Sequence, residues 1–133
     1  MKISAEHLGL PAREPAALKD WYVRVLEAEV VFADEKTPPA FFVRLGSLLL
    51  EIYQAGSSSP VTADNRVAGW RHLALRVESI DNAKKELESR AIRFDQEIKP
   101  AGGGGRILFF KDAEDNLLHL VERPPESIFA ALR

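Results

Sequence analysis

Residues 104–122 read GGRILFFKDAEDNLLHLVE, and this stretch decides the fold. Apolar side chains dominate residues 106–110 and again residues 117–122, as they do in β-strands. Between them, residues 112–116 are Asp, Ala, Glu, Asp and Asn, which are mostly turn-forming types. The stretch therefore predicts two antiparallel strands joined by a short turn.

The sequence before this hairpin predicts a strand and a helix. In residues 70–77 the aliphatic side chains of Leu73, Leu75 and Val77 occupy every second position, which indicates a strand. Ser79 is a suitable N-cap for a helix over about 81–91. The apolar side chains expected to face inward are those of Ile80, Ala83, Leu87 and Ala91. The remaining segments predict a strand at 92–98, a loop at 100–105 and a short terminal helix at 126–132.

The first half of the chain predicts the same order of elements. They are a strand at 3–10, a turn between Pro11 and Pro15, a helix at 15–27, and strands at 29–33, 41–45 and 48–54. Coincidence is the alternative, because many α+β domains contain two helices. A repeat of about 65 residues instead favours two tandem βαβββ modules in one α+β domain. The modules cover about 3–54 and 70–124, with a polar linker at about 55–69 and a tail at 125–133.

Length and composition limit the class of protein. A chain of 133 residues suits one domain, and the absence of cysteine excludes disulfides and thiolate metal sites. Eighteen basic and twenty acidic residues give a net charge of −2, which makes nucleic acid an unsuitable partner. No apolar run is long enough to span a membrane, and the N-terminus does not resemble a signal peptide. We expect a cytoplasmic protein.

The three histidines of the chain occupy equivalent positions in the repeat. His7 and His72 lie 65 residues apart in the first predicted strand of each half. Glu51 and His119 lie 68 residues apart in the last predicted strand of each half. Because successive side chains of a strand point to opposite faces, all four fall on the face opposite the aliphatic residues that pack on the helices. Each histidine alone is most simply a core or surface residue, but the four together predict a metal site.

Imidazole and carboxylate groups suit zinc, iron, nickel, copper or manganese. Three further residues share this face by alternation and are candidate substrate contacts. They are Tyr53, Trp70 and Arg76. The run Gly102–Gly105 precedes no helix and no Lys-Ser/Thr, so it is not a phosphate loop. It is either a lid beside the site or a plain turn.

Several of these segments resemble the vicinal oxygen chelate superfamily, which includes glyoxalase I, bleomycin-resistance proteins and extradiol dioxygenases. The resemblance is strongest over residues 104–122 and extends to 6–10 (EHLGL), 50–52 (LEI) and 71–77 (RHLALRV). It implies that the two modules form a cupped mixed sheet around a metal cleft, with the helices on the outer face. It also implies one divalent metal ion, zinc, iron, nickel or manganese, bound by four residues. These are His7, Glu51, His72 and His119.

His119 departs from the family pattern, which usually has glutamate at that position. Only Glu51 then remains to move a proton, so a two-base isomerisation is disfavoured. The resemblance implies a metal-dependent enzyme acting on a small oxygenated metabolite by a lyase, isomerase or dioxygenase step, with Glu51 as catalytic base. The alternative is a non-catalytic, antibiotic-binding protein of the bleomycin-resistance type. A homodimer is also expected, with the modules paired either within one chain or between two chains.

Overall fold

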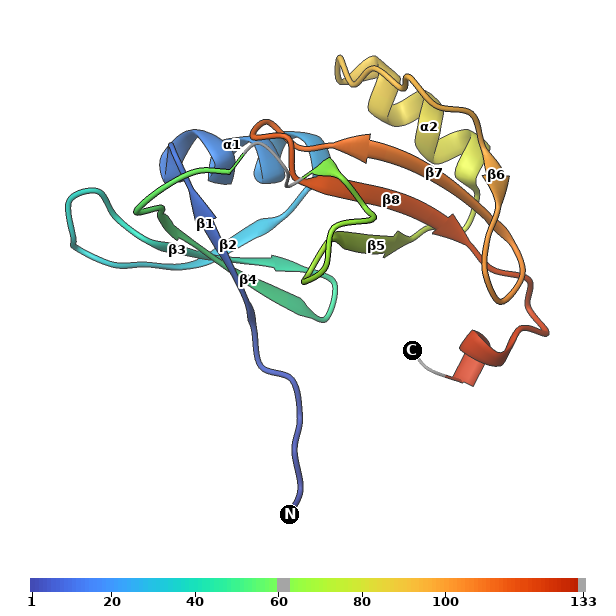
Figure 1. Cartoon of the computed structure of the whole chain (residues 1–133), viewed down its shortest axis with the longest axis horizontal. Coiled ribbons are helices and arrows are strands. Elements are labelled where there is room, and N and C mark those ends of the chain that lie inside the picture. Colours follow the sequence, from blue (N-terminus) through green and yellow to red (C-terminus); the bar gives the residue numbers. More distant parts are fainter. Residues whose placement is uncertain (60–62, 132–133) are drawn as a thin grey trace. The chain divides into compact units, whose positions relative to one another are not determined.

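The computed structural model describes residues 1–59 and 63–131, with only the backbone of the last two. The chain divides into two compact units. Unit 1 contains residues 1–59 together with Asp112–Glu114, and unit 2 contains residues 63–111 and 115–131. Each unit holds one four-stranded mixed sheet and one α-helix (Figure 1).

Unit 1 has the strand order β1-β4-β3-β2 in its sheet. Strand β1 runs parallel to β4, and the other neighbouring strands are antiparallel. Its elements are β1 (Leu8–Ala12), α1 (Pro15–Leu26), β2 (Glu29–Ala33), β3 (Phe41–Leu45) and β4 (Leu48–Gln54).

Unit 2 repeats this topology with the strand order β5-β8-β7-β6, in which β5 is parallel to β8. Its elements are β5 (His72–Arg76), α2 (Ile80–Ser89), β6 (Lys99–Pro100), β7 (Arg106–Lys111), β8 (Leu117–Glu122) and a 3-10 helix, Ile128–Ala131. The predicted α+β architecture of two βαβββ modules is therefore confirmed, as two separate four-stranded sheets. No helix within the described parts of the chain has the length and apolar character needed to cross a membrane.

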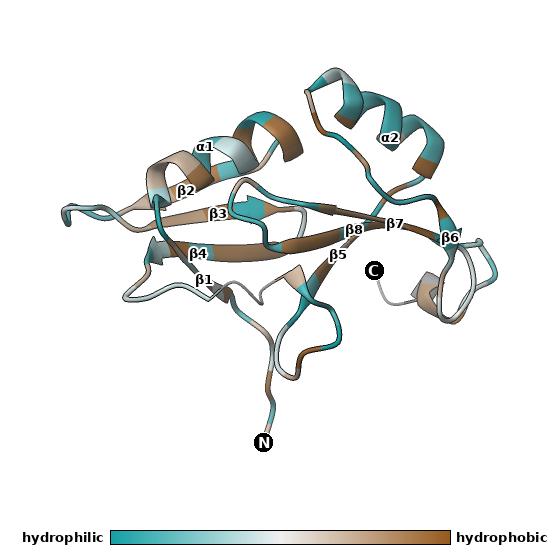
Figure 2. Ribbon diagram, turned by 45° about the horizontal axis from the view of Figure 1, so that its top comes forward, coloured by the Kyte–Doolittle hydropathy of each residue, from teal (hydrophilic) through white to brown (hydrophobic). Residues whose placement is uncertain are grey.

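In each unit the helix covers the aliphatic face of the sheet. Leu50 and Ile52 are buried, whereas Glu51, which lies between them in β4, stays partly exposed on the other face. The same alternation places Leu118 and Leu120 opposite His119 in β8. Figure 2 shows β3, β4, β7 and β8 mainly in brown and α2 mainly in teal. Burial of these strand side chains against the helices contributes hydrophobic stabilisation.

The turn between β7 and β8 completes unit 1. The phenolic oxygen of Tyr22 donates a 2.8 Å hydrogen bond to Oδ2 of Asp112, and both side chains are buried. The carboxylate of Glu114 accepts hydrogen bonds from the backbone nitrogens of Arg13 and Glu14, at 2.7 and 2.9 Å. Glu14 occupies the N-cap position of α1, but its side chain makes no capping hydrogen bond. Glu114 therefore supplies the negative charge and the acceptors that the start of α1 lacks.

The first strand begins later than predicted. Residues 3–7 are not in a strand, and β1 starts at Leu8 and continues through Pro11, which was predicted to lie in a turn. Pro11 pairs with Tyr53 in β1, which is an edge strand. Proline has no N–H group, and an edge strand tolerates this because one of its sides has no neighbouring strand to receive that hydrogen bond. His7 thus lies immediately before the strand rather than within it.

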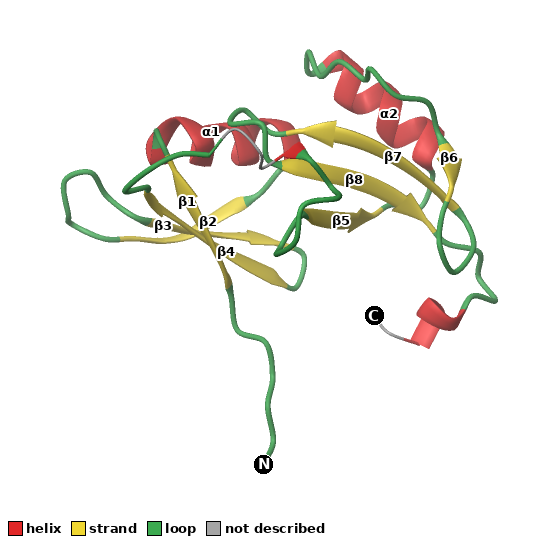
Figure 3. Ribbon diagram, viewed as in Figure 1, coloured by secondary structure: helices red, strands yellow, loops and turns green. Residues whose placement is uncertain are grey.

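The predicted strand at 92–98 is wrong. This segment is a loop, and the only pairing at this edge is the two-residue β6, which falls in the predicted loop and lies against β7 (Figure 3). Phe94 instead packs on Phe110 of β7, with 5.7 Å between ring centroids. The apolar pattern that resembled a strand is thus explained by packing rather than by backbone pairing.

The ends of other elements also differ from the prediction. Ser79 caps α2 as predicted, with its hydroxyl accepting a hydrogen bond from the nitrogen of Asn82. Ile80 and Leu87 are buried, but α2 ends at Ser89, and Ala91 is exposed in a turn with φ of 66°. The tail forms the short 3-10 helix inside the predicted 126–132, and residue 132 lies outside the described residues. The described parts of the predicted linker, 55–59 and 63–69, contain no α-helix or strand.

Candidate functional site

Unit 1 brings His7 and Glu51 together. Nε2 of His7 lies 3.6 Å from Oε2 of Glu51, and the two side chains are 34% and 31% exposed. The ring of Phe42 makes an edge contact with the His7 ring, with 5.3 Å between centroids. The pair is therefore accessible to solvent within unit 1 and contacts one aromatic side chain.

Unit 2 brings His72 and His119 together. Their ring centroids lie 4.7 Å apart, and Phe109 contacts both rings. His72 is exposed, whereas His119 is only 6% exposed. Burial lowers the pKa of His119, and the nearby basic groups of His72, Arg123 and Lys99 also lower it, whereas the hydrogen bond to the Leu120 carbonyl opposes this effect. His119 is therefore neutral near pH 7, which is the form that binds metals.

The Nδ1 atom of every histidine is hydrogen-bonded to an oxygen atom. The partners are Oε1 of Glu6 for His7 at 2.9 Å, Oδ1 of Asn65 for His72 at 2.7 Å, and the carbonyl of Leu120 for His119 at 3.1 Å. These oxygens only accept, so Nδ1 carries the proton of each neutral ring. Nε2 then keeps its lone pair, and this is the usual arrangement of metal-binding histidines. The donor chemistry of the three rings therefore fits a divalent metal ion.

The two pairs are equivalent in the two sheets. Glu51 lies opposite Gly9, which is two residues after His7. His119 lies opposite Ala74, which is two residues after His72. The two pairs therefore have the same register in their sheets, as their equivalent positions in the sequence repeat predicted. Each unit carries two candidate metal ligands. The described residues of either unit contain no group of three or more His, Asp or Glu side chains placed to hold a metal.

The candidate substrate contacts lie at different places. Tyr53 of β4 is partly exposed, and its ring lies next to Gly9 of β1. Arg76 ends β5, and its Nη2 donates a hydrogen bond to the carbonyl of Phe129 at 3.1 Å. Trp70 was predicted within the strand but precedes it, and it is 90% exposed. Trp70 therefore does not share the face of β5, and its predicted contact with a substrate has no support from strand geometry.

Sequence reasoning missed three residues of this region. Phe42 and Phe109 contact the histidines, and Asn65 holds the ring of His72. Strand alternation could have identified Phe109, because Leu108 and Phe110 on either side face α2. Asn65 lies in the predicted linker, where no pattern indicates which side chain reaches back to the strand.

A family model for the glyoxalase/bleomycin resistance protein/dioxygenase superfamily matches residues 4–120. Methylmalonyl-CoA epimerase of Bos taurus is 28% identical over an alignment of 116 residues, which covers 82% of this chain and 66% of that protein. The chain therefore spans about two thirds of the length of this relative.

Solved structures with the same fold include a glyoxalase family protein from Enterococcus faecalis, with a TM-score of 0.76 and 26% identity. The match covers 90% of this chain and 97% of that one. The fosfomycin resistance protein FosX from Listeria monocytogenes, solved with Mn(II) and a sulfate ion, matches over the full length of both chains. Its TM-score is 0.71, and its 17% identity shows a likeness of fold alone. Because the family model covers most of the sequence, this chain belongs to the glyoxalase/bleomycin resistance protein/dioxygenase superfamily.

Proposed function

We propose that this protein is a metal-dependent enzyme that acts on a small oxygenated metabolite by a lyase, isomerase or dioxygenase step. The proposed ligand set is His7, Glu51, His72 and His119, two from each unit. The observation that supports the proposal is that the two pairs occupy equivalent positions in the strand register. In addition, each of the three histidines keeps a lone pair on Nε2 that can bind a metal. The FosX structure, which has the same fold, was solved with Mn(II).

A divalent metal ion in such a site supplies Lewis acidity to substrate oxygens. The chain itself would supply the proton transfer. Glu51 is the carboxylate of the set, and its side chain is 31% exposed. To act as a base it would have to leave the metal or swing away from it. We assign Glu51 as the general base. His119 is buried, and we assign it as a metal ligand that does not exchange protons with the substrate.

Metal analysis tests the proposal on protein purified without a histidine tag and reconstituted with zinc, iron, nickel or manganese. We expect about one metal ion per chain and, for the protein loaded with nickel, a d–d absorption spectrum typical of mostly nitrogen donors. Glu51→Gln and His72→Ala should each weaken metal binding by at least about tenfold, as loss of one ligand does. Glu97→Gln, in the loop before β6, is the control for loss of a carboxylate. Stoichiometric metal with equal affinity in all three variants would contradict the ligand assignment.

One observation favours a second function. In each unit the described residues bring only two candidate ligands together, which suits a protein that binds a small molecule without metal. In that case the protein would sequester an antibiotic in the manner of the bleomycin-resistance proteins. Less than about 0.2 metal per chain after reconstitution, with antibiotic binding unchanged by chelator, would favour this function. We further propose a homodimer and a small-molecule substrate, both on the family resemblance.

A further inference from the structure

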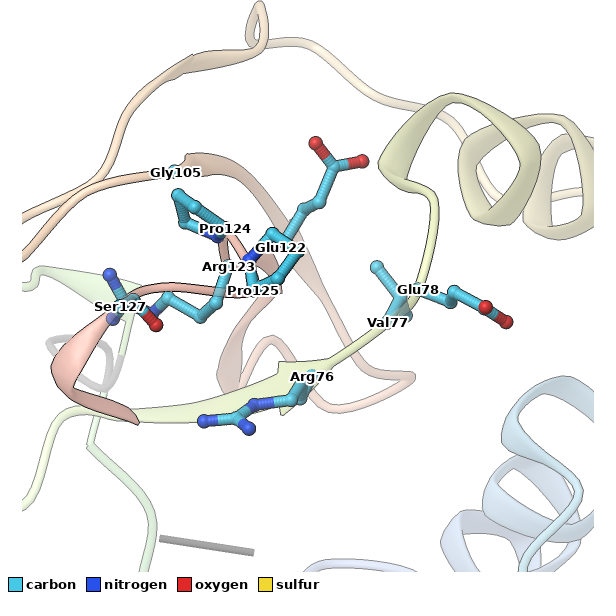
Figure 4. A pocket seen from close by; sticks show the side chains of 9 residues that line it. All are labelled: Arg76, Val77, Glu78, Gly105, Glu122, Arg123, Pro124, Pro125 and Ser127. Carbon is cyan, nitrogen blue, oxygen red and sulfur yellow. The ribbon is translucent and has the colours of Figure 1, made fainter. Parts of the chain in front are cut away.

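Unit 2 contains a pocket of about 850 Å³ at the end of β5 and β8 (Figure 4). Arg76, Arg123, Ser127 and Gly105 line it, together with the carboxylates of Glu78 and Glu122. Its size falls in the range of small-molecule sites. All of its lining residues belong to unit 2.

The two arginines of the pocket have no carboxylate partner within the described parts of the chain. Arg76 donates from Nη2 to the carbonyl of Phe129. Arg123 donates from Nη1 to the carbonyls of Gly102 and Gly104, both at 2.6 Å. The contacts place the guanidinium groups but do not neutralise them, and other N–H donors of each group remain for a ligand.

The two carboxylates of the pocket do not neutralise the arginines. The carboxylate of Glu122 accepts hydrogen bonds from Arg106 and from the backbone nitrogen of Ile80 at the start of α2. Figure 4 shows the side chains of Glu78 and Glu122 directed away from those of Arg76 and Arg123. The side of the pocket where the two guanidinium groups lie is therefore positively charged.

A neutral hydrogen-bonding group completes this side of the pocket. The hydroxyl oxygen of Ser127 is buried and finds no partner among the described residues. A buried hydroxyl without a partner is costly unless a ligand or water satisfies it. Ser127 lines the same pocket as Arg76 and Arg123, and a hydroxyl together with two guanidinium groups is a donor set suited to an oxyanion.

The two arginines are placed like the two histidines of unit 2, each four residues further along the chain. Arg76 lies four residues after His72 on β5, and Arg123 lies four residues after His119 on the chain leaving β8. At about 3.3 Å per residue, the two pairs are separated by about 13 Å along the strands. The equivalent positions of unit 1 are Pro11 and Ala55, so the cationic pair occurs in one unit only.

We propose that this pocket binds the oxyanion group of a small metabolite, a carboxylate or a phosphate, through Arg76, Arg123 and Ser127. Anion binding rests on the pocket alone. Its assignment as the anionic end of the substrate, about 13 Å from the histidines along the strands, rests on the proposed function. The proposal adds a substrate class, an extended anionic metabolite, to the proposed metal site.

Calorimetric titration of chelator-treated, full-length protein at low salt tests the proposal, with inorganic phosphate in one arm and malonate in the other. We expect at least one anion to bind, and the tighter one identifies the source of the oxyanion. Arg76→Gln should weaken binding by at least about tenfold, and Ser127→Ala by a smaller factor. Neither change removes the contacts of Arg123 with the Gly102–Gly105 turn, so both variants should fold.

The matched control is Arg24→Gln, which removes the same charge from the exposed last turn of α1. It should bind the anion as the unchanged protein does. Failure of both anions to bind, or equal weakening in Arg24→Gln and Arg76→Gln, would overturn the proposal. Metal analysis of the same protein tests the proposed metal site separately. Anion binding without metal uptake contradicts only the proposed function, and metal uptake without anion binding contradicts only this pocket.

Discussion

Tyr22 and Asp112, 90 residues apart in the chain, are joined by a 2.8 Å hydrogen bond between buried side chains. Tyr22 lies on α1, and Asp112 begins the turn that follows β7. Two residues further, Glu114 caps the start of the same helix. Helix α1 is therefore held by a turn that the repeat assigns to the other half of the sequence.

Replacing Tyr22 by Phe should destabilise the protein. The change removes a donor from the buried Asp112 carboxylate, and loss of such a hydrogen bond costs about 1–3 kcal/mol of unfolding free energy. Urea denaturation followed by circular dichroism measures the loss. Tyr53→Phe, at a partly exposed tyrosine, is the control and should change the free energy by less than about 0.5 kcal/mol. Equal effects of the two changes would contradict the importance of this bond.

The same tyrosine predicts a pH dependence. Burial, with the Asp112 charge and hydrogen bond, raises the pKa of Tyr22 well above its ordinary value of 10.0. The unfolded chain then loses the phenolic proton first as the pH rises, so this contribution to stability is complete below pH 10 and is lost above it. Denaturation between about pH 9 and 11 should show a steeper loss in the unchanged protein than in Tyr22→Phe. Parallel curves would contradict the raised pKa.

Glu114→Gln should weaken the start of α1. The amide keeps one acceptor oxygen but loses the charge and the second acceptor, and such caps contribute about 0.5–2 kcal/mol. Thermal unfolding should show a lower Tm, and hydrogen exchange should show faster exchange of the first amides of α1. Glu35→Gln, an exposed loop carboxylate, is the matched control. Exchange rates that change equally in both variants would argue against capping.

Gly105→Ala should be among the most damaging small changes. Gly105 has φ of 99°, and a Cβ atom there would lie 1.9 Å from the backbone oxygen of Glu122. The clash with backbone and the left-handed conformation together should cost more than about 2 kcal/mol. Gly56→Ala is the control, because nothing lies within 4 Å of a Cβ at that position. A difference below about 0.5 kcal/mol between the two variants, measured by urea denaturation, would be inconsistent with this geometry.

His119→Glu restores the residue type usual in the family. If His119 is a ligand, the variant should still bind metal, but with an altered preference among zinc, nickel and manganese, because a carboxylate is a harder donor. Competition between metals, followed by elemental analysis, measures the change. His119→Ala should bind at least about tenfold more weakly. Unchanged metal content and spectra in His119→Ala would remove this residue from the set.

Mixing two defective variants decides whether one chain or two supply the ligands. One variant carries His7→Ala and Glu51→Ala, and the other carries His72→Ala and His119→Ala. If two chains of a dimer share each site, the mixed dimer regains one intact ligand set, and metal binding returns after refolding the mixture. If each chain forms its own site, every site lacks two ligands and metal binding stays absent. Each variant refolded alone is the control.

Most of the fold is predictable because alternation and breakers are local signals. Residues 41–45 and 48–54 form strands with the predicted bounds, on either side of the turn at Gly46 and Ser47. The segment 92–98 was wrongly predicted as a strand because Phe94 is apolar for another reason: it packs on Phe110 of β7 and lies under Lys84 of α2. The start of β1 misled because proline reads as a turn, although an edge strand tolerates it.

The candidate site is predictable only in part. Spacing within the repeat identified His7 with Glu51 and His72 with His119, and each pair is close in its own unit. Spacing cannot identify Asn65, whose side chain comes from an irregular segment. Nor can it identify Asp112 and Glu114 as partners of α1, because that contact joins residues from different halves of the repeat.

The difference between Arg76 with Arg123 and their counterparts Pro11 with Ala55 has a consequence for how such a protein can change over time. In an assembly of two identical chains, one codon change alters both copies of a position, so equivalent positions always carry the same residue. Joining the copies in a single polypeptide removes that constraint. Here one unit carries two cationic side chains at positions that are uncharged in the other unit. If unit 2 binds an oxyanion as proposed, a ligand with a single anionic group can be held by only one of the two units.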